Sequence, residues 1–123
     1  MNRPLPSPER RRQLPTQFSW IDQRLARHNY FPRTTSDAWL LYLFLVTVAD
    51  ADGVSFYSEL TLCQRLGWDR SRLRHNRQAL LRLQLIAYAA PLYQVLALPA
   101  PRPARDPAPH LHRLRQQLRG EHR

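Results

Sequence analysis

The positions of the prolines constrain the fold of this chain more than any other feature of its sequence. Nine of the 11 prolines lie at or before residue 15 or at or after residue 99, which leaves Pro32 and Pro91 between them. Proline interrupts helices and sheets, because its ring fixes φ and its nitrogen carries no hydrogen. The pattern predicts one folded domain over residues 16–98.

The segments outside this domain are too polar to bury a core of their own. From their composition, residues 1–15 are expected to form a disordered, Pro-rich basic arm, and residues 99–109 a Pro-rich linker. Residues 110–123 predict a basic amphipathic tail, which is marginal as an isolated helix and should become helical only when it is bound. The apolar stripe of this tail consists of Leu111, Leu114 and Leu118.

The chain is strongly basic. Nineteen basic residues, all arginine, oppose nine acidic ones, which gives a net charge of +10. A polyanionic partner is therefore the first class of partner to consider. An excess of arginine is also typical of a GC-rich bacterial genome, so the places where the arginines cluster are more informative than their number.

Several classes of function lack their usual residues. Cys63 is the single cysteine, so no internal disulfide can form, and no Cys/His set offers the ligands of a structural zinc site. The sequence has no Gly-rich phosphate loop and no catalytic set of nucleophile, acid and base. The N-terminal residues are not expected to form a secretory signal, because no apolar segment follows their charged part. No apolar run reaches the roughly 20 residues that span a bilayer. We therefore expect a cytoplasmic, non-enzymatic protein with no cofactor, no metal and no membrane partner.

Apolar spacing predicts two helices in the first half of the domain. Aromatic and aliphatic side chains predict a helix over residues 18–27, with Trp20 in the core. Thr34 and Asp37 then form a capping box, which opens a helix over residues 38–48. Because this second helix is apolar on nearly all sides, it should lie at the centre of the fold.

Two capped helices and three short strands follow. Ser58 is expected to cap a helix over residues 59–66, and Gly67 to end it in a left-handed conformation. Asp69 is expected to cap a basic helix over residues 70–83. A short strand over residues 54–57 and a hairpin of residues 86–88 and 93–96 complete the pattern. The inner face of the helix that Ser58 opens is expected to comprise Leu60, Cys63 and Leu66.

This order of elements resembles the winged helix-turn-helix DNA-binding superfamily. The resemblance is carried by residues 58–86, S-E-L-T-L-C-Q-R-L-G-W-D-R-S-R-L-R-H-N-R-Q-A-L-L-R-L-Q-L-I, and extends over residues 36–98. It implies a mainly α fold with a small β-sheet (α+β), in which a helical core is followed by a C-terminal β-hairpin wing. The segments F-S-W-I-D-Q-R-L, L-Y-L-F-L-V-T-V-A-D and P-L-Y-Q-V-L-A-L are similar to small uncharacterised bacterial proteins associated with mobile elements, which implies no particular activity.

Charge is segregated along the domain. Residues 69–85 contain five arginines and one aspartate, a net charge of +4, whereas residues 34–66 contain four acidic residues and one arginine, a net charge of −3. A helix fits the major groove of B-DNA, where side chains near its N-terminus reach base edges. The basic helix is therefore the expected recognition helix.

Eight residues of this helix are candidates for contact with DNA. With Leu73 buried, a rotation of 100° per residue places Ser71, His75, Gln78 and Arg82 on the opposite side. Arg70, Arg74 and His75 are the strongest candidates for bases or phosphates, and Arg72, Arg77 and Arg82 are expected at phosphates or in solvent. The full set is Arg70, Ser71, Arg72, Arg74, His75, Arg77, Gln78 and Arg82.

Three positions depart from the superfamily pattern. Asn76 and Arg77 stand where relatives usually have small or apolar core residues, and Gln84 replaces a small residue that is often glycine. The expected wing tip, residues 89–91, carries no basic side chain. Flexible basic arms can lie along a duplex, so the N-terminal arm is an alternative source of DNA contacts. Its candidate residues are Arg10, Arg11 and Arg12.

The sequence thus favours a DNA-binding protein, as a transcriptional regulator or as an accessory factor of a replicon or mobile element. The alternative is a protein-interaction module whose basic tails dock on an acidic partner, and RNA is not excluded. The bland alternative is a basic helix face that is merely solvated. A homodimer could be joined through the leucines of the tail or through residues 18–25.

Overall fold

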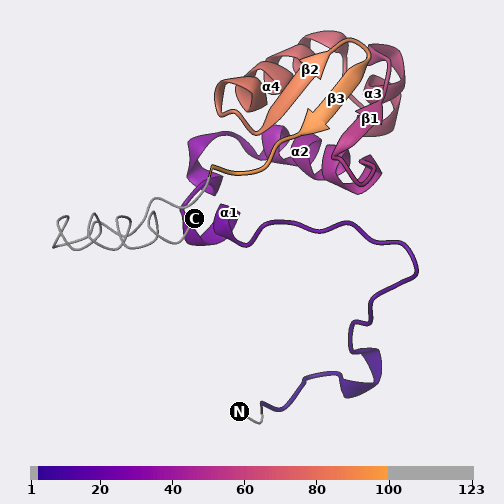
Figure 1. Cartoon of the computed structure of the whole chain (residues 1–123), viewed down its shortest axis with the longest axis vertical. Coiled ribbons are helices and arrows are strands. Elements are labelled where there is room, and N and C mark those ends of the chain that lie inside the picture. Colours follow the sequence, from indigo (N-terminus) through magenta and orange to yellow (C-terminus); the bar gives the residue numbers. More distant parts are fainter. Residues whose placement is uncertain (1–2, 100–123) are drawn as a thin grey trace, which may run out of the picture.

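The computed structural model describes residues 3–99 as an α+β domain that is approached by an extended N-terminal segment (Figure 1). Over these residues the chain forms four α-helices, a three-stranded antiparallel sheet and two short 3₁₀ turns, η1 and η2. No helix in this range is both long and apolar enough to cross a membrane. In chain order the elements are η1 (Pro8–Arg10), α1 (Arg24–Arg27), η2 (Phe31–Arg33), α2 (Ser36–Val48), β1 (Val54–Phe56), α3 (Glu59–Leu66), α4 (Arg70–Arg82), β2 (Ile86–Ala89) and β3 (Leu92–Val95).

The apolar helix α2 forms as expected, but it is not buried on all sides, because Leu40 is 43% and Leu43 45% exposed. Its cap also lies one residue later than Thr34. The Thr35 hydroxyl accepts a hydrogen bond from the amide of Ala38 at 3.2 Å. Thr35 takes the position because its backbone is extended, with φ of −81° and ψ of 162°, as an N-cap requires. The helix turns Leu41 and Leu45 into the core, where neither is exposed.

The helices α3 and α4 are joined by the predicted turn. The Ser58 hydroxyl accepts from the amide of Thr61 at 3.1 Å, and Gly67 ends α3 with φ of 70°. Position 67 therefore suits glycine, which pays no Cβ penalty there. The inner face of α3 differs from the expectation: Leu62 is fully buried and Leu60 is 58% exposed. Four apolar residues in eight allow two faces, and packing against α4 selects the one that contains Leu62.

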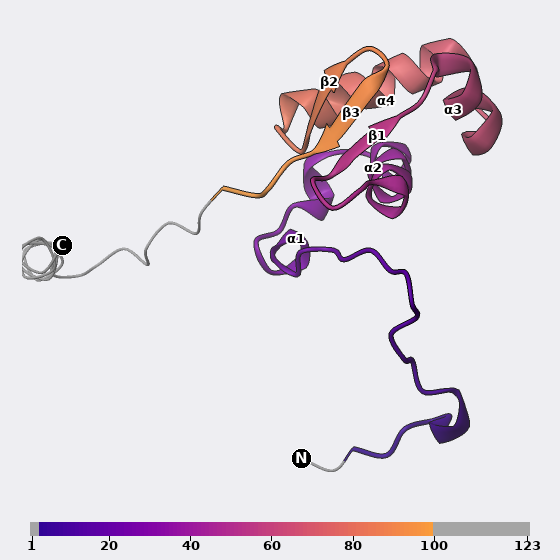
Figure 2. The ribbon, with the colours of Figure 1, turned by 45° about the vertical axis from the view of Figure 1, so that its right-hand side comes forward.

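The sheet has the strand order β1-β3-β2, and both pairings are antiparallel. The hairpin lies where the sequence predicts it, with Ala87 opposite Gln94 and Tyr88 opposite Tyr93. The helix α2 contacts α4 and β3, α3 contacts α4, and α4 contacts β2. Figure 2 shows these elements as one packed unit from which the N-terminal segment runs away.

The predicted helix over residues 18–27 is wrong except for its last turn, α1. Phe18 is 60% and Trp20 is 73% exposed on an extended segment, and only Leu25 of this region enters the core. The helix starts only after Asp22, whose carboxylate accepts from the amide of Arg24 at 2.9 Å, so residues 18–21 lie outside it. A seam built on a helix of residues 18–25 therefore has no basis in this structure, and the tail residues Leu111, Leu114 and Leu118 lie outside the described residues.

Candidate nucleic-acid interface

The turn between α3 and α4 fixes where the basic helix begins. The amide of Trp68 donates to the carbonyl of Cys63 at 2.9 Å, and the Trp68 ring is buried. The Asp69 carboxylate then accepts from the amide of Arg72 at 2.8 Å, as an N-cap does. On the inner side of α4, Leu73 and Leu80 are fully buried. The opposite side of the helix consequently faces solvent.

The solvent side of α4 carries a stripe of polar residues along its whole length. Ser71, His75, Gln78 and Arg82 are all exposed, at spacings of four, three and four residues. Arg70 is exposed beside the start of this stripe. None of these five side chains makes a hydrogen bond or ion pair with another of the residues 3–99. They form what we call the outer stripe of α4, and their donors and acceptors are available to a ligand.

Arg72 lies on the flank of the helix and is held by α2. Its guanidinium donates two hydrogen bonds to the Asp37 carboxylate, both at 3.0 Å. The guanidinium carbon also lies 5.0 Å from the centre of the Trp68 ring. The hydrogen bonds from Arg72 lower the pKa of Asp37. This ion pair ties the start of α4 to the start of α2.

Arg74 and Arg77 are both held by Glu59, the first residue of α3. Arg74 donates two hydrogen bonds to the Glu59 carboxylate, at 3.1 and 2.9 Å, and Arg77 donates one at 2.8 Å. The hydrogen bonds from Arg74 and then Arg77 lower the pKa of Glu59 to about 2. The carboxylate therefore stays ionised at neutral pH and fixes α4 against α3. The Arg74 side chain remains 58% exposed, so it can still be reached from solvent.

Arg77 does not lie at the surface that the sequence analysis expected. Its side chain is only 11% exposed. The guanidinium donates to the Tyr93 hydroxyl at 2.9 Å and covers the Tyr88 ring at 4.2 Å from its centre. Arg77 thus joins α4 to the hairpin, and it is a structural residue rather than a candidate for contact with phosphate.

The structure explains why a polar residue, Asn76, can occupy a position where the superfamily pattern has small or apolar residues. Asn76 is buried between α2 and α4, where its carbonyl oxygen accepts from the Thr35 hydroxyl at 3.3 Å. Its amide group donates to the carbonyl of Arg72 at 2.8 Å. The side chain is therefore paired at both ends, as a buried amide must be to avoid a desolvation cost. The residue that caps α2 is thereby fixed to the middle of α4.

The opposite charges of the two halves of the domain are thus partly paired in space. Asp37 and Glu59 come from the acidic block and hold three of the five arginines of α4. Sequence reasoning did not predict that Asp37 and Glu59 pair with arginines of α4. The surplus of acidic residues before α4 was the one sign of such pairing in the sequence. What remains unpaired on α4 among the described residues is the outer stripe.

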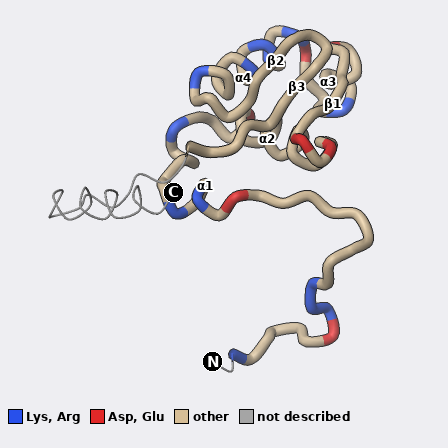
Figure 3. Tube along the Cα trace, viewed as in Figure 1, with Lys and Arg blue, Asp and Glu red and all other residues tan. Residues whose placement is uncertain are grey.

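The arm and the wing lie apart from the outer stripe. Arg10, Arg11 and Arg12 are exposed on the extended segment, which Figure 3 shows far from α4. At the hairpin tip Ala89, Ala90 and Pro91 are exposed and carry no charge. Because the arm lies far from α4 and the hairpin tip is uncharged, α4 is the candidate interface of the domain.

The described part of the chain offers no metal-binding cluster and no reactive cysteine. Over residues 3–99, no three His, Cys, Asp or Glu side chains lie close enough together to hold a metal ion. Cys63 is buried against the core and is a packing residue here. His110 and His112 lie outside the described residues. Comparisons with protein-family models, with curated proteins and with solved structures give no match.

Proposed function

We propose that this chain binds double-stranded DNA with α4, and that its domain is a winged helix-turn-helix. The observation that carries the proposal is the outer stripe of α4, in which five exposed polar or basic side chains have no partner among residues 3–99. On the flanks of α4, Arg72, Arg74 and Arg77 are paired with Asp37 and Glu59, whereas the stripe leaves its donors and acceptors free.

The arrangement of the elements supports this choice of fold. The helices α2, α3 and α4, the strand β1 between α2 and α3, and the hairpin after α4 follow the order of a winged helix-turn-helix. The tight connection at Gly67 places α3 and α4 in contact. In such a domain α4 is the helix that enters the major groove.

The side chains divide by chemistry into two roles. Ser71, His75 and Gln78 can donate and accept hydrogen bonds at base edges. Arg70 and Arg82, near the two ends of α4, are suited to phosphates on either side of the groove. Arg74 joins them if it exchanges Glu59 for a phosphate, which an exposed ion pair allows, since such pairs contribute only about 0–1 kcal/mol.

The proposal is tested by fluorescence anisotropy of the full chain with two 30-base-pair duplexes. One has a random sequence, and the other comes from upstream of the gene that encodes the chain. Neutralisation of about five to eight phosphates predicts a slope of log affinity against log salt of about −5 to −7. Preference for the upstream duplex that persists at higher salt would indicate base readout and a regulator or initiator.

Two variants separate α4 from the charge of the whole chain. Arg70→Ala is expected to reduce the salt slope by about one unit. Arg27→Ala removes the same charge from α1, where the side chain is exposed, and should leave affinity almost unchanged. Equal effects of the two variants, or a flat salt response of the unaltered chain, would overturn the proposal and direct attention to an acidic protein partner.

A further inference from the structure

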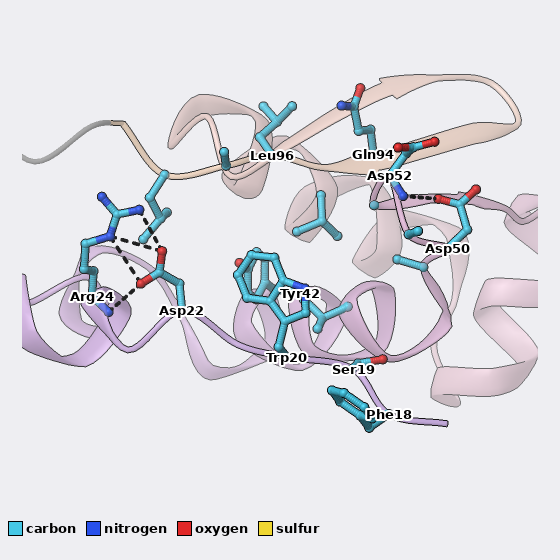
Figure 4. Close-up of a pocket in the computed structure, with 17 residues that line it drawn as sticks. Phe18, Ser19, Trp20, Asp22, Arg24, Tyr42, Asp50, Asp52, Gln94 and Leu96 are labelled. Atoms are coloured by element: carbon cyan, nitrogen blue, oxygen red, sulfur yellow. Dashed lines mark hydrogen bonds and ion pairs between the residues drawn. The ribbon is translucent and has the colours of Figure 1, made fainter. Parts of the chain in front are cut away.

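A second site lies away from the outer stripe, where the N-terminal segment crosses the end of α2. It is a groove of about 590 Å³. Its sides are residues 18–24, the end of α2, the turn of residues 49–53 and residues 94–98 (Figure 4). Four separate stretches of the chain therefore meet around it.

The walls of the groove are aromatic and acidic. The rings of Trp20 and Tyr42 line it beside Val46 and Leu98, so it can receive apolar side chains. Three carboxylates line it too, those of Asp22, Asp50 and Asp52, with Arg24 as the single basic residue of the lining. On a chain of net charge +10, this is a local surplus of negative charge. Figure 3 shows the two acids of the α2–β1 turn well away from the arginines of α4.

Tyr42 forms a fixed aromatic part of the groove. The residue is 6% exposed overall, and its ring lies in the lining of the groove. Within residues 3–99 the buried side-chain polar atom that lacks a hydrogen bond is the Ser55 hydroxyl, so the Tyr42 hydroxyl is open to solvent. An apolar side chain of an occupant can therefore pack on the Tyr42 ring while the hydroxyl stays solvated.

The chain itself leaves the domain at the rim of this groove. Arg24 donates to the carbonyl of Pro99 at 2.8 Å, and Arg24 is held by Asp22 at 2.8 Å. Leu98 is buried at the same point. The segment that starts at residue 100 therefore begins beside the acidic and aromatic walls.

The composition of that segment complements the groove. Residues 100–123 contain six arginines and two acidic residues. Within residues 110–119 the leucines recur at spacings of three and four, between arginines. About 10 extended residues can span more than 30 Å, so reach from Pro99 does not limit docking. A short tether also gives an effective concentration of about a millimolar.

We propose that the groove binds residues 110–119 of the same chain. The leucines pack on Trp20, Tyr42 and Val46, and the arginines lie against Asp50 and Asp52. The basic tail is thereby held on the side of the domain away from the outer stripe. This inference does not depend on DNA binding by α4.

Paramagnetic relaxation in the full chain tests the docking directly. A nitroxide is attached at Gly120→Cys in a Cys63→Ala background, and amide signals are compared with those of the reduced label. We expect the amides of residues 50–53 and 96–98 to lose most of their intensity, while those of Ser71 and His75 are unaffected. Retention of intensity around the groove would overturn the proposal.

Two variants and one mixture test the specificity of this effect. Asp52→Arg reverses a charge in the groove, and Leu114→Glu breaks the apolar stripe, so each should restore the signals. Glu9→Gln alters an exposed acid of the arm and is the matched control, with no expected change. Broadening that Asp52→Arg and Leu114→Glu leave intact would contradict docking in the groove. A mixture of nitroxide-labelled chains without isotope and isotope-labelled chains without nitroxide separates docking within one chain from docking between two copies. Broadening in this mixture would assign the groove to a second copy and overturn docking within one chain.

Discussion

Gln84 adopts the left-handed backbone conformation just after α4, with φ of 58°. A side chain is disfavoured there because its Cβ crowds the following carbonyl, whereas glycine is free of this clash. The position is the one at which the superfamily pattern favours a small residue. The structure thus shows why a small residue suits this position, and that Gln84 adopts the left-handed conformation at a cost.

Gln84→Gly is expected to raise the free energy of unfolding by about 0.5–1 kcal/mol. The gain from relieving the left-handed strain exceeds the loss from a more flexible unfolded chain. Urea unfolding followed by circular dichroism measures it. Gln64→Gly is the matched control: it makes the same change inside α3, where glycine should lower stability by about 1 kcal/mol. A loss of stability in both variants would show that Gln84 is not strained.

At the scale of elements, the helices whose caps stand next to their apolar runs were predictable, and the start of α1 was not. Ser58, Gly67 and Asp69 mark the ends of α3 and α4 in the sequence, and the structure confirms all three. The segment before α1 has apolar residues, but the cap lies at Asp22, after most of them, so residues 18–21 are extended. Pairing across the fold could not be predicted, because Asp37 and Arg72 are 35 residues apart and periodicity within one helix contains no information about its neighbours.

The placement of α4 against α3 should depend on pH through Glu59. Its pKa is about 2 in the folded protein against 4.5 for the unperturbed group, so the folded state binds this proton less readily than the unfolded state. The stabilisation is therefore complete above about pH 4.5 and is lost as the pH falls toward 2. For partly exposed ion pairs we expect about 1 kcal/mol in total.

The pH dependence is measured by urea unfolding of the unaltered chain and of Glu59→Gln between pH 6 and pH 2.5. The two should differ by about 1 kcal/mol at pH 6 and converge as the pH falls. Asp52→Asn is the control, since the Asp52 side chain makes no ion pair within residues 3–99. A constant difference across the range would refute the assignment to Glu59.

At the scale of the whole molecule, 15 of the 19 arginines occur in three places: the arm, α4 and the segment after Pro99. Among the elements of residues 3–99, α4 carries the most arginines, together with exposed side chains that can both donate and accept hydrogen bonds. The arm is extended and exposed, so its arginines can meet phosphates only in a manner independent of sequence.

Replacement of Arg10, Arg11 and Arg12 by alanine tests this division of roles. We expect weaker binding to random and upstream duplexes by the same factor, with a salt slope smaller by up to about two to three units. Anisotropy titrations of both duplexes provide the measurement. A loss confined to the upstream duplex would mean that the arm takes part in base readout, contrary to this expectation.

The carboxylate of Glu59 occupies Arg74 with the same two-pronged geometry that a phosphate would use. If α4 binds DNA as proposed, this carboxylate competes with the nucleic acid for Arg74. A phosphate that captures Arg74 must first displace it, and α3 then loses one of its two ties to α4. Glu59→Gln should consequently bind duplexes more tightly and fold less stably, so one guanidinium links affinity and stability in opposite directions.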